Sequence, residues 1–96
     1  MYGVYDNAVF DGADSTGGWF QFSRFNDSSF RNVTARDVDF RWASFKNVDF
    51  TGANLSGADL GSAVLDGALW NNTICPDGTN SNDNVERSCE GHLSNR

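Results

Sequence analysis

The chain has 96 residues, so it forms one small domain at most, and its eight Phe and three Trp are typical of a folded chain. Its net charge of −6 disfavours direct binding to nucleic acid. It has no apolar run long enough to cross a membrane and no basic-then-apolar leader, so we expect no membrane partner; if the protein is secreted, its signal has been removed or lies outside this sequence.

An apolar residue recurs at nearly every fifth position from Tyr5 to Trp70, and a small residue stands two positions before it. Twelve of the fourteen central positions are bulky and apolar, and the position two before is always Gly, Ala, Ser or Val. A period of five fits neither an α-helix, whose apolar stripe recurs at about 3.6 residues, nor a strand, whose faces alternate. If both positions point to a common axis, each pentad forms one side of a coil, and stacked coils pair their backbone groups about 4.8 Å apart. The pattern therefore predicts a solenoid.

The pattern resembles that of the pentapeptide-repeat family, which has a central Leu or Phe, a small residue two before it, and often Asp or Asn directly before it. Residues 53–57 (ANLSG) and 58–62 (ADLGS) match this pattern residue for residue. The resemblance implies an all-β fold, a right-handed quadrilateral β-helix with four pentads, or twenty residues, in each coil. We therefore expect a repeat domain of about 3.5 coils at residues 1–70 and a capping tail closed by a disulfide at residues 71–96.

The first ten residues already follow the repeat, with Tyr5 and Phe10 at central positions. A solenoid normally has a polar or covered end, but Met1, Tyr2 and Val9 help to make this end apolar. Three explanations stay open: a preceding segment has been cut away, a partner covers the end, or the first coil frays.

Two central positions, Ser15 and Ala35, break the apolar pattern and lie twenty residues apart. In a four-sided coil they stack on the same face. Val33, two before Ala35, restores part of the lost volume, as a close-packed interior requires. The alternative is a small cavity along that face.

Three aromatic residues, Trp19, Phe22 and Trp42, occupy outward positions that are otherwise mostly Asp, Asn, Ser, Thr and Gly. Phe22 and Trp42 are twenty residues apart, so they stack on one corner, with Trp19 on the adjoining side. An aromatic stripe on a solvent-facing surface is a candidate contact patch. In the alternative interpretation, the rings lie flat against the coil surface or cover a side loop.

Four basic residues recur at one outward position in consecutive pentads and predict a belt around one coil: Arg31, Arg36, Arg41 and Lys46. Asp37, Asp39 and Asp49 lie beside this belt, so we expect ion pairs between neighbouring coils, each worth about 0–1 kcal/mol. Because the belt encircles the rod and does not form one face, it does not indicate a nucleic-acid site.

After Trp70 the period is expected to stop, and Pro76-Asp77-Gly78 signals a turn into a polar loop. The two cysteines, Cys75 and Cys89, flank that loop and indicate a disulfide that closes the end of the rod. A disulfide in turn indicates an oxidising compartment, so we expect an extracytoplasmic or secreted protein. The tail also resembles the end of secreted bacterial pentapeptide-repeat proteins, on the motif from Cys75 to Gly78 and on residues 89–93 (CEGHL).

The alternative for the tail is a zinc site formed by Cys75, Cys89 and His92. A structural zinc site normally has four ligands, and the spacing fits no common pattern, so we expect no metal. We also expect no cofactor. The lone His and the turn-facing carboxylates give no acid, base or nucleophile arrangement, which predicts a protein that is not an enzyme.

Two function classes follow. The first is a structural or protein-interaction module of a secreted bacterial pentapeptide-repeat protein, without an assignable activity, whose partner is an unidentified protein or a second copy bound through the apolar N-terminal coil or the aromatic stripe. The second rests on the resemblance and the net charge: some family members are acidic rods that mimic DNA and modulate a type II topoisomerase. The basic belt, the disulfide and a predicted rod length of about 17 Å, half a DNA turn, stand against it.

Overall fold

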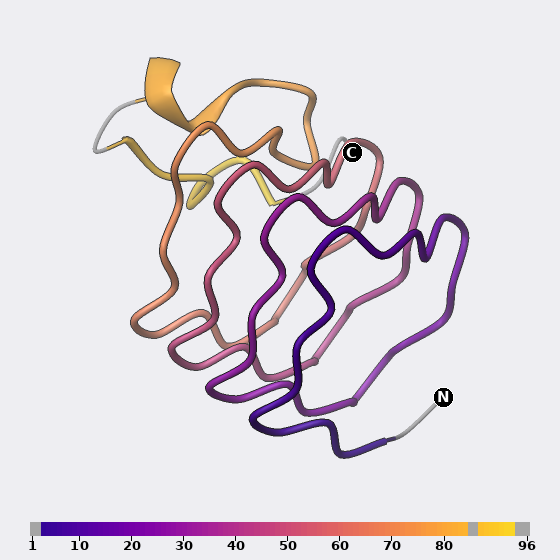
Figure 1. Ribbon diagram of the computed structural model, residues 1–96. Coiled ribbons are helices and arrows are strands. Elements are labelled where there is room, and N and C mark those ends of the chain that lie inside the picture. The colour runs from indigo at the N-terminus through magenta and orange to yellow at the C-terminus, as the bar shows by residue number, and fades with distance from the viewer. Residues whose placement is uncertain (1–2, 85–86, 94–96) are drawn as a thin grey trace.

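The computed structural model describes residues 3–84 and 87–93, and shows a stack of square coils along one axis, from the indigo first coil to the orange fourth coil (Figure 1). Each residue that directly precedes a central position forms a parallel bridge with the residue twenty positions later, from Val4↔Arg24 to Asn54↔Ile74. Every strand is thus a single bridged residue. The helical element of the described chain is a short 3-10 helix, η1 (Ser81–Asp83). No described helix has the length and apolarity that a membrane crossing requires.

Backbone hydrogen bonds between coils explain why a five-residue side is stable. The N–H of Phe25, a central residue, donates to the carbonyl of Ser44 in the next coil at 2.8 Å, and the N–H of Arg24 donates to Gly3 in the previous coil at 2.8 Å. The same two bonds recur along the stack. Buried amides and carbonyls are therefore paired although no side is long enough to be an ordinary strand.

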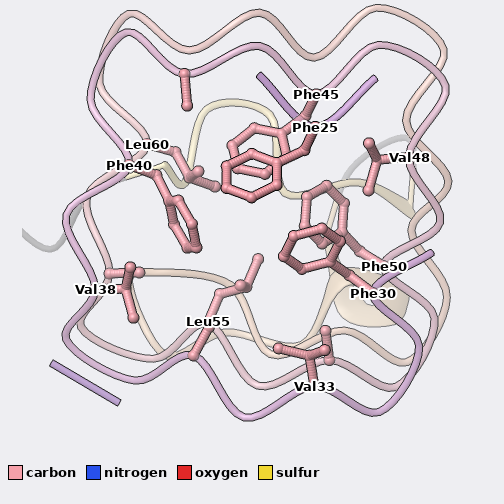
Figure 2. Packing of buried hydrophobic residues seen from close by; sticks show 14 of the residues in the cluster. Phe25, Phe30, Val33, Val38, Phe40, Phe45, Val48, Phe50, Leu55 and Leu60 are labelled. Carbon is pink, nitrogen blue, oxygen red and sulfur yellow. The ribbon is translucent and has the colours of Figure 1, made fainter. Parts of the chain in front are cut away.

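The multiples of five fill the axis of the stack, as the sequence predicts. Figure 2 shows the rings of Phe25 and Phe45 above one another inside the square outline, and their centroids are 5.1 Å apart with nearly parallel planes. Phe30 and Phe50 form a second column with centroids 5.6 Å apart. Central residues from Phe25 to Leu65 are buried, so the inward assignment is confirmed for this part of the chain.

The column that begins with Ser15 continues through Ala35 and Leu55. Ala35 is fully buried, and Val33 two positions before it is also buried and points into the square (Figure 2). The bridge Asp14↔Thr34 places Ser15 one coil from Ala35, as predicted. The side chain of Val33 therefore fills part of the space that the small side chain of Ala35 leaves on this side of the coil.

The prediction that the period stops after Trp70 is wrong by one pentad. Ile74 bridges to Asn54 in the coil register, and Cys75 is fully buried at the next central position. Thr73 takes the small-residue position, and its hydroxyl donates to the carbonyl of Phe50 at 2.7 Å. The sequence hides this pentad because Thr and Cys replace the usual Ala and Leu, although Cys is among the residues that are most often buried.

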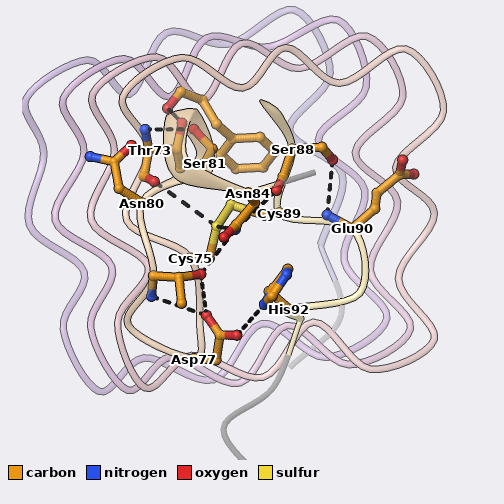
Figure 3. Close-up of a disulfide and its surroundings, with 12 residues drawn as sticks. Thr73, Cys75, Asp77, Asn80, Ser81, Asn84, Ser88, Cys89, Glu90 and His92 are labelled. Carbon is orange, nitrogen blue, oxygen red and sulfur yellow. Dashed lines mark hydrogen bonds and ion pairs between the residues drawn. A yellow bond between two sulfur atoms is a disulfide. The ribbon is translucent and has the colours of Figure 1, made fainter. Parts of the chain in front are cut away.

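The tail beyond Pro76 crosses the end of the fourth coil (Figure 3). It returns to the stack at Leu93, whose carbonyl accepts a 2.9 Å hydrogen bond from the N–H of Leu60. If the repeat continued regularly, the N–H of Leu60 would instead donate to the carbonyl of the residue at position 79. Leu93 also packs against the hydrophobic core. The fourth side of the last coil is thus supplied by a segment fourteen residues further along the chain.

Candidate interaction surface

The predicted aromatic patch (Trp19, Phe22 and Trp42) is positioned by two neighbouring columns of the stack. Trp19 bridges to Asp39 and so lies on one side of the first coil. Phe22 follows at the next corner, and its N–H donates to the carbonyl of Arg41, which places Trp42 directly after it in the next coil. The predicted arrangement, with two rings on one corner and Trp19 on the adjoining side, is the arrangement in the structure.

Both corner aromatics occupy a strained backbone conformation. All fourteen positions of this corner register, from Asn7 to Asn72, have a positive φ, and twelve of them are Gly, Asn, Asp or Ser. Phe22 and Trp42, with φ of 61° and 60°, are the exceptions. The left-handed conformation costs an L-residue roughly 1–2 kcal/mol, and bulky residues adopt it rarely. The fold itself therefore favours a small or polar residue at both positions.

The two rings stack on each other and stay exposed. The centroids of Phe22 and Trp42 are 5.0 Å apart, and their planes differ by 5°. The exposed fractions are 57% for Phe22, 49% for Trp42 and 74% for Trp19. The rings contact each other along the rod, and about half of each corner residue faces solvent.

A polar network lies beside the rings, and its ion pair between Arg41 and Asp39 forms within one coil and not between neighbouring coils as expected. Arg41 donates to Asp39 through Nε at 3.0 Å and through an η nitrogen at 2.8 Å, and its guanidinium carbon lies 5.3 Å from the centroid of the Trp42 ring. Gln21 also donates to Asp39, at 2.8 Å. The hydrogen bond to Asp39, and then its charge, raises the pKa of Arg41. Aromatic residues and Arg are both enriched in the cores of protein interfaces.

Two of the four basic residues of the belt, Arg31 and Arg41, lie close to carboxylates. Arg41 pairs with Asp39 within its own coil, whereas Arg31 lies 3.8 Å from Asp49, which is on the same side in the next coil. Arg24 and Asp6 form a further pair between the first two coils, at 2.7 Å. Exposed pairs of this kind contribute little to stability, and within the belt they offset the charges of Arg31 and Arg41.

The second predicted surface, the apolar N-terminal coil, is exposed where it is described. Val4 and Val9 are 52% and 74% exposed, and the rings of Tyr5, Phe10 and Phe20 are only partly buried against the core. Met1 and Tyr2, which belong to the same prediction, lie outside the described residues.

The tail holds the predicted disulfide. Cys75 and Cys89 are bonded, with Cα atoms 5.3 Å apart, and both are fully buried. Because both sulfur atoms belong to this bond, they cannot serve as the thiolate ligands of the zinc alternative. In the described residues no group of three His, Cys, Asp or Glu side chains is arranged to hold a metal ion.

His92 contacts Asp77 through Nδ1, and the hydroxyl of Thr79 donates to the other oxygen of the same carboxylate at 2.6 Å. Burial is the largest influence on this carboxyl and opposes its ionisation, but hydrogen bonds from Thr79 and His92 together outweigh it and lower the pKa of Asp77. The carboxylate lies between the hydroxyl and the imidazole, so the imidazole does not activate a nucleophile. This cluster joins the two ends of the tail.

An open pocket of about 490 Å³ lies between the fourth coil and the tail. Its lining includes Leu65, Ala68 and Trp70 from the coil and Ser88 and Glu90 from the tail. No pattern in the sequence indicates this pocket, because it depends on how the non-repeating tail returns over the coil.

Comparison with known proteins agrees with this architecture. Residues 20–52 match the family model of pentapeptide repeats, which is described as eight copies. Among solved structures, the fold is similar to HetL, a pentapeptide repeat protein involved in heterocyst differentiation regulation in the cyanobacterium Nostoc sp. strain PCC 7120, with a TM-score of 0.51 and 19% identity over 78% of this chain and 42% of HetL. Rfr23, a pentapeptide repeat protein of the cyanobacterium Cyanothece 51142, matches with a TM-score of 0.33 and 12% identity over 76% of this chain and 81% of Rfr23.

This chain therefore spans less than half of the HetL chain that it resembles. None of the curated proteins gives a significant match.

Proposed function

This chain is a pentapeptide-repeat protein, and we propose that it is a non-enzymatic module of a secreted bacterial protein that presents the aromatic patch to a protein partner. Pentapeptide-repeat proteins fold as right-handed quadrilateral β-helices, and the likeness to HetL supports this fold here. They are structural or interaction modules, so binding through a surface is the class of function to test.

The observation that carries the proposal is the backbone of Phe22 and Trp42. Every other residue of their corner register is Gly, Asn, Asp or Ser, which tolerate a positive φ. Two large rings at these positions oppose the local preference of the chain and expose apolar surface beside Arg41. Strained residues cluster at sites where function requires a particular side chain, so this corner is the first place to look for a partner.

The finer architecture is part of the proposal. We take the rod to be the predicted three and a half coils of residues 1–70 together with the further pentad of residues 71–75, and the rest of the tail, up to residue 96, to be its cap. The disulfide from Cys75, in the last pentad, and the contact of Leu93 with the core support a capping role. A loop closed by a disulfide also supports an extracytoplasmic location, because such bonds persist in oxidising compartments.

Site-specific photo-crosslinking tests the patch. A photoreactive phenylalanine analogue is placed at Trp42 or, as a matched control, at Ser62, which occupies the same corner one coil further on and has a φ of 59°. In cells that make the protein, we expect one dominant crosslinked protein from position 42 and none from position 62. Equal crosslinking from both positions, or none from either, contradicts a partner site at this corner.

DNA mimicry is the second candidate, and its support is the net charge of −6. Several carboxylates that such mimicry would need are engaged within the rod, since Asp6 pairs with Arg24 and Asp39 with Arg41. A DNA gyrase supercoiling assay separates the two candidates: inhibition at low micromolar protein favours the mimic, and full activity favours the interaction module.

A further inference from the structure

The tail covers only two of the four sides at the end of the rod. Cys89 is bonded to Cys75 on one side, and Leu93 packs against the core on another. The core columns of the other two sides end in Leu65 and Trp70, and the open pocket of about 490 Å³ lies at these two ends. Ligand pockets have volumes of roughly 300–1,000 Å³, so the space that the tail leaves is large enough for a small molecule.

The floor of this pocket is apolar and aromatic. The indole of Trp70 stacks on the ring of Phe50, with centroids 4.9 Å apart and planes that differ by 8°. One face of the indole is therefore covered by the core, and the other face is turned toward the end of the rod, where the pocket lies. Leu65 and Ala68 complete the floor. A cation over the face of a Trp ring is attracted by the ring quadrupole, and Trp is the best ring for this contact.

The ionised side chains around this floor are negative. Asp66 lines the pocket from the coil and Glu90 lines it from the tail, and none of the seven described lining residues is basic. Among the described residues neither carboxylate has a hydrogen-bond or ion-pair partner, whereas Asp6 and Asp39 pair with arginines. Two unpaired carboxylates beside an aromatic floor favour a positively charged ligand.

The disulfide fixes the tail side of the pocket. Ser88 and Glu90 stand on either side of the fully buried Cys89, and the hydroxyl of Ser88 accepts from the N–H of Glu90 at 2.9 Å. In Figure 3 the side chain of Glu90 extends away from the disulfide. The backbone of Glu90 is thus held in place by a covalent link to the rod, and its carboxylate is attached at a defined point beside the floor.

The two carboxylates alone do not make a metal site. Calcium takes about six to eight oxygen ligands. In the part of the chain that the structure describes, no group of three His, Cys, Asp or Glu side chains is arranged to hold a metal ion. An organic ammonium ion suits both parts of the pocket, because the carboxylates balance its charge and its apolar groups leave water against the floor.

We propose that this pocket binds a small organic ammonium ion. The cationic nitrogen lies over the outer face of Trp70, near the carboxylates of Asp66 and Glu90, and the apolar groups of the ligand contact Leu65 and Ala68. This site is at the end of the rod and is separate from the aromatic patch, so the proposal does not depend on a protein partner at Trp42.

An NMR titration of the isotope-labelled chain tests the proposal, with choline as the probe. The control ligand is neohexanol, the neutral isostere in which a carbon atom replaces the charged nitrogen. The three Trp side chains give three indole N–H signals, and of these residues only Trp70 is among the described lining. We expect choline to shift the Trp70 indole signal and the amides of Ala68 and Glu90 until saturation, with Trp19 and Trp42 unaffected. Neohexanol should bind about tenfold or more weakly.

Two variants with the same change of charge show whether the wall of the pocket takes part. Glu90→Gln removes a carboxylate from the pocket, and Asp83→Asn removes an exposed one from the tail outside it. We expect Glu90→Gln to weaken choline binding by about threefold and Asp83→Asn to leave it unchanged, with the melting temperature of the wild type in both.

Four results would each overturn the proposal: no saturable shift of the Trp70 signal, equal shifts of all three indole signals, neohexanol binding as tight as that of choline, or equal effects of the two variants. Equal indole shifts would mean that choline contacts any exposed Trp. The choline titration and the crosslink from position 42 are separate readouts, so failure of one leaves the other measurable.

Discussion

Phe45→Ala tests the inward assignment most directly. Phe45 is fully buried, stacks on Phe25 at 5.1 Å, and packs edge-on against Phe40 at 5.1 Å and Phe30 at 5.8 Å. Its ring therefore connects its own coil to three sides of the preceding coil. Truncating a buried Phe removes its transfer free energy and leaves a cavity, which costs about 3–5 kcal/mol. For a chain of this size each kcal/mol lowers the melting temperature by roughly 4–8 °C.

Phe22→Ala is the matched control, because the same atoms are removed from an exposed position of the stack. It loses the face-to-face contact with Trp42, worth about 0.5–1.5 kcal/mol, and leaves the backbone strain unchanged. Urea denaturation followed by circular dichroism gives both free energies of unfolding, and the m-value checks that the unfolding remains comparable. Equal losses for the two variants, or a smaller loss at Phe45, would refute the assignment of the axis.

Three further predictions use the same measurements. Gly57→Ala should destabilise the chain by more than about 1 kcal/mol, because φ is +76° and a Cβ would lie 2.0 Å from Oδ1 of Asp37. Gly12→Ala is the control: φ is +73° but no atom lies within 4 Å of the added Cβ, so it should show only the cost of the backbone conformation. Equal losses of stability for the two variants would exclude the clash with Asp37. Reduction of the disulfide between Cys75 and Cys89 should lower the free energy of unfolding by roughly 3 kcal/mol, by the loop-entropy relation, and so lower the melting temperature. The β-structure signal in circular dichroism should remain, because most of the core precedes Cys75 in the chain. Complete unfolding on reduction would show that the tail is required for folding. The pKa of Asp77 lies below its ordinary value of 3.8, so its stabilising contribution is present above that pH and is lost as pH falls through the folded-state pKa. Asp77→Asn should therefore make the free energy of unfolding fall less steeply as the pH is lowered in this acidic range. An unchanged decrease would contradict a stabilising role of the Asp77 carboxylate.

The inward and outward positions of the rod could be predicted from the sequence because the same five-residue pattern recurs along it. Phe25, Phe45 and Leu65 belong to one column, and the period alone places them there. Twelve of the fourteen corner positions from Asn7 to Asn72 are Gly, Asn, Asp or Ser, a composition that suits their positive φ; the same conformation predicts a cost for Asn47→Ala, at a φ of 58°. The sequence also marked Phe22 and Trp42 as unusual, and the structure adds the strain that makes them so.

The tail was less predictable, because its placement depends on contacts between residues far apart in sequence. Cys75 is both a core residue and half of the disulfide, and only the second property is visible in a count of cysteines. Leu93 completes the last coil without any periodic signal around it. Arg41 was assigned to a belt by its spacing, but its contacts with Asp39 and Trp42 are decided by side-chain geometry.

The strain at Trp42 yields a last prediction, which separates folding from binding. Trp42→Asn loses the stack with Phe22, about 0.5–1.5 kcal/mol, and the contact with Arg41, about 0.5–1 kcal/mol. It also relieves part of a left-handed cost of roughly 1–2 kcal/mol, because Asn tolerates this conformation. The two effects nearly cancel, so urea denaturation should give a stability within about 1 kcal/mol of the wild type.

Asn47→Trp is the reverse control at the same register, and should destabilise by about 1–2 kcal/mol because it adds the strain without a stacking partner one coil away, where Asp27 stands. If Trp42→Asn instead lowers stability by much more than about 2 kcal/mol, the ring is a structural element and the fold alone accounts for its presence. If stability is kept, the fold does not need Trp42, and a binding role becomes the reason for an aromatic side chain at a position that suits asparagine.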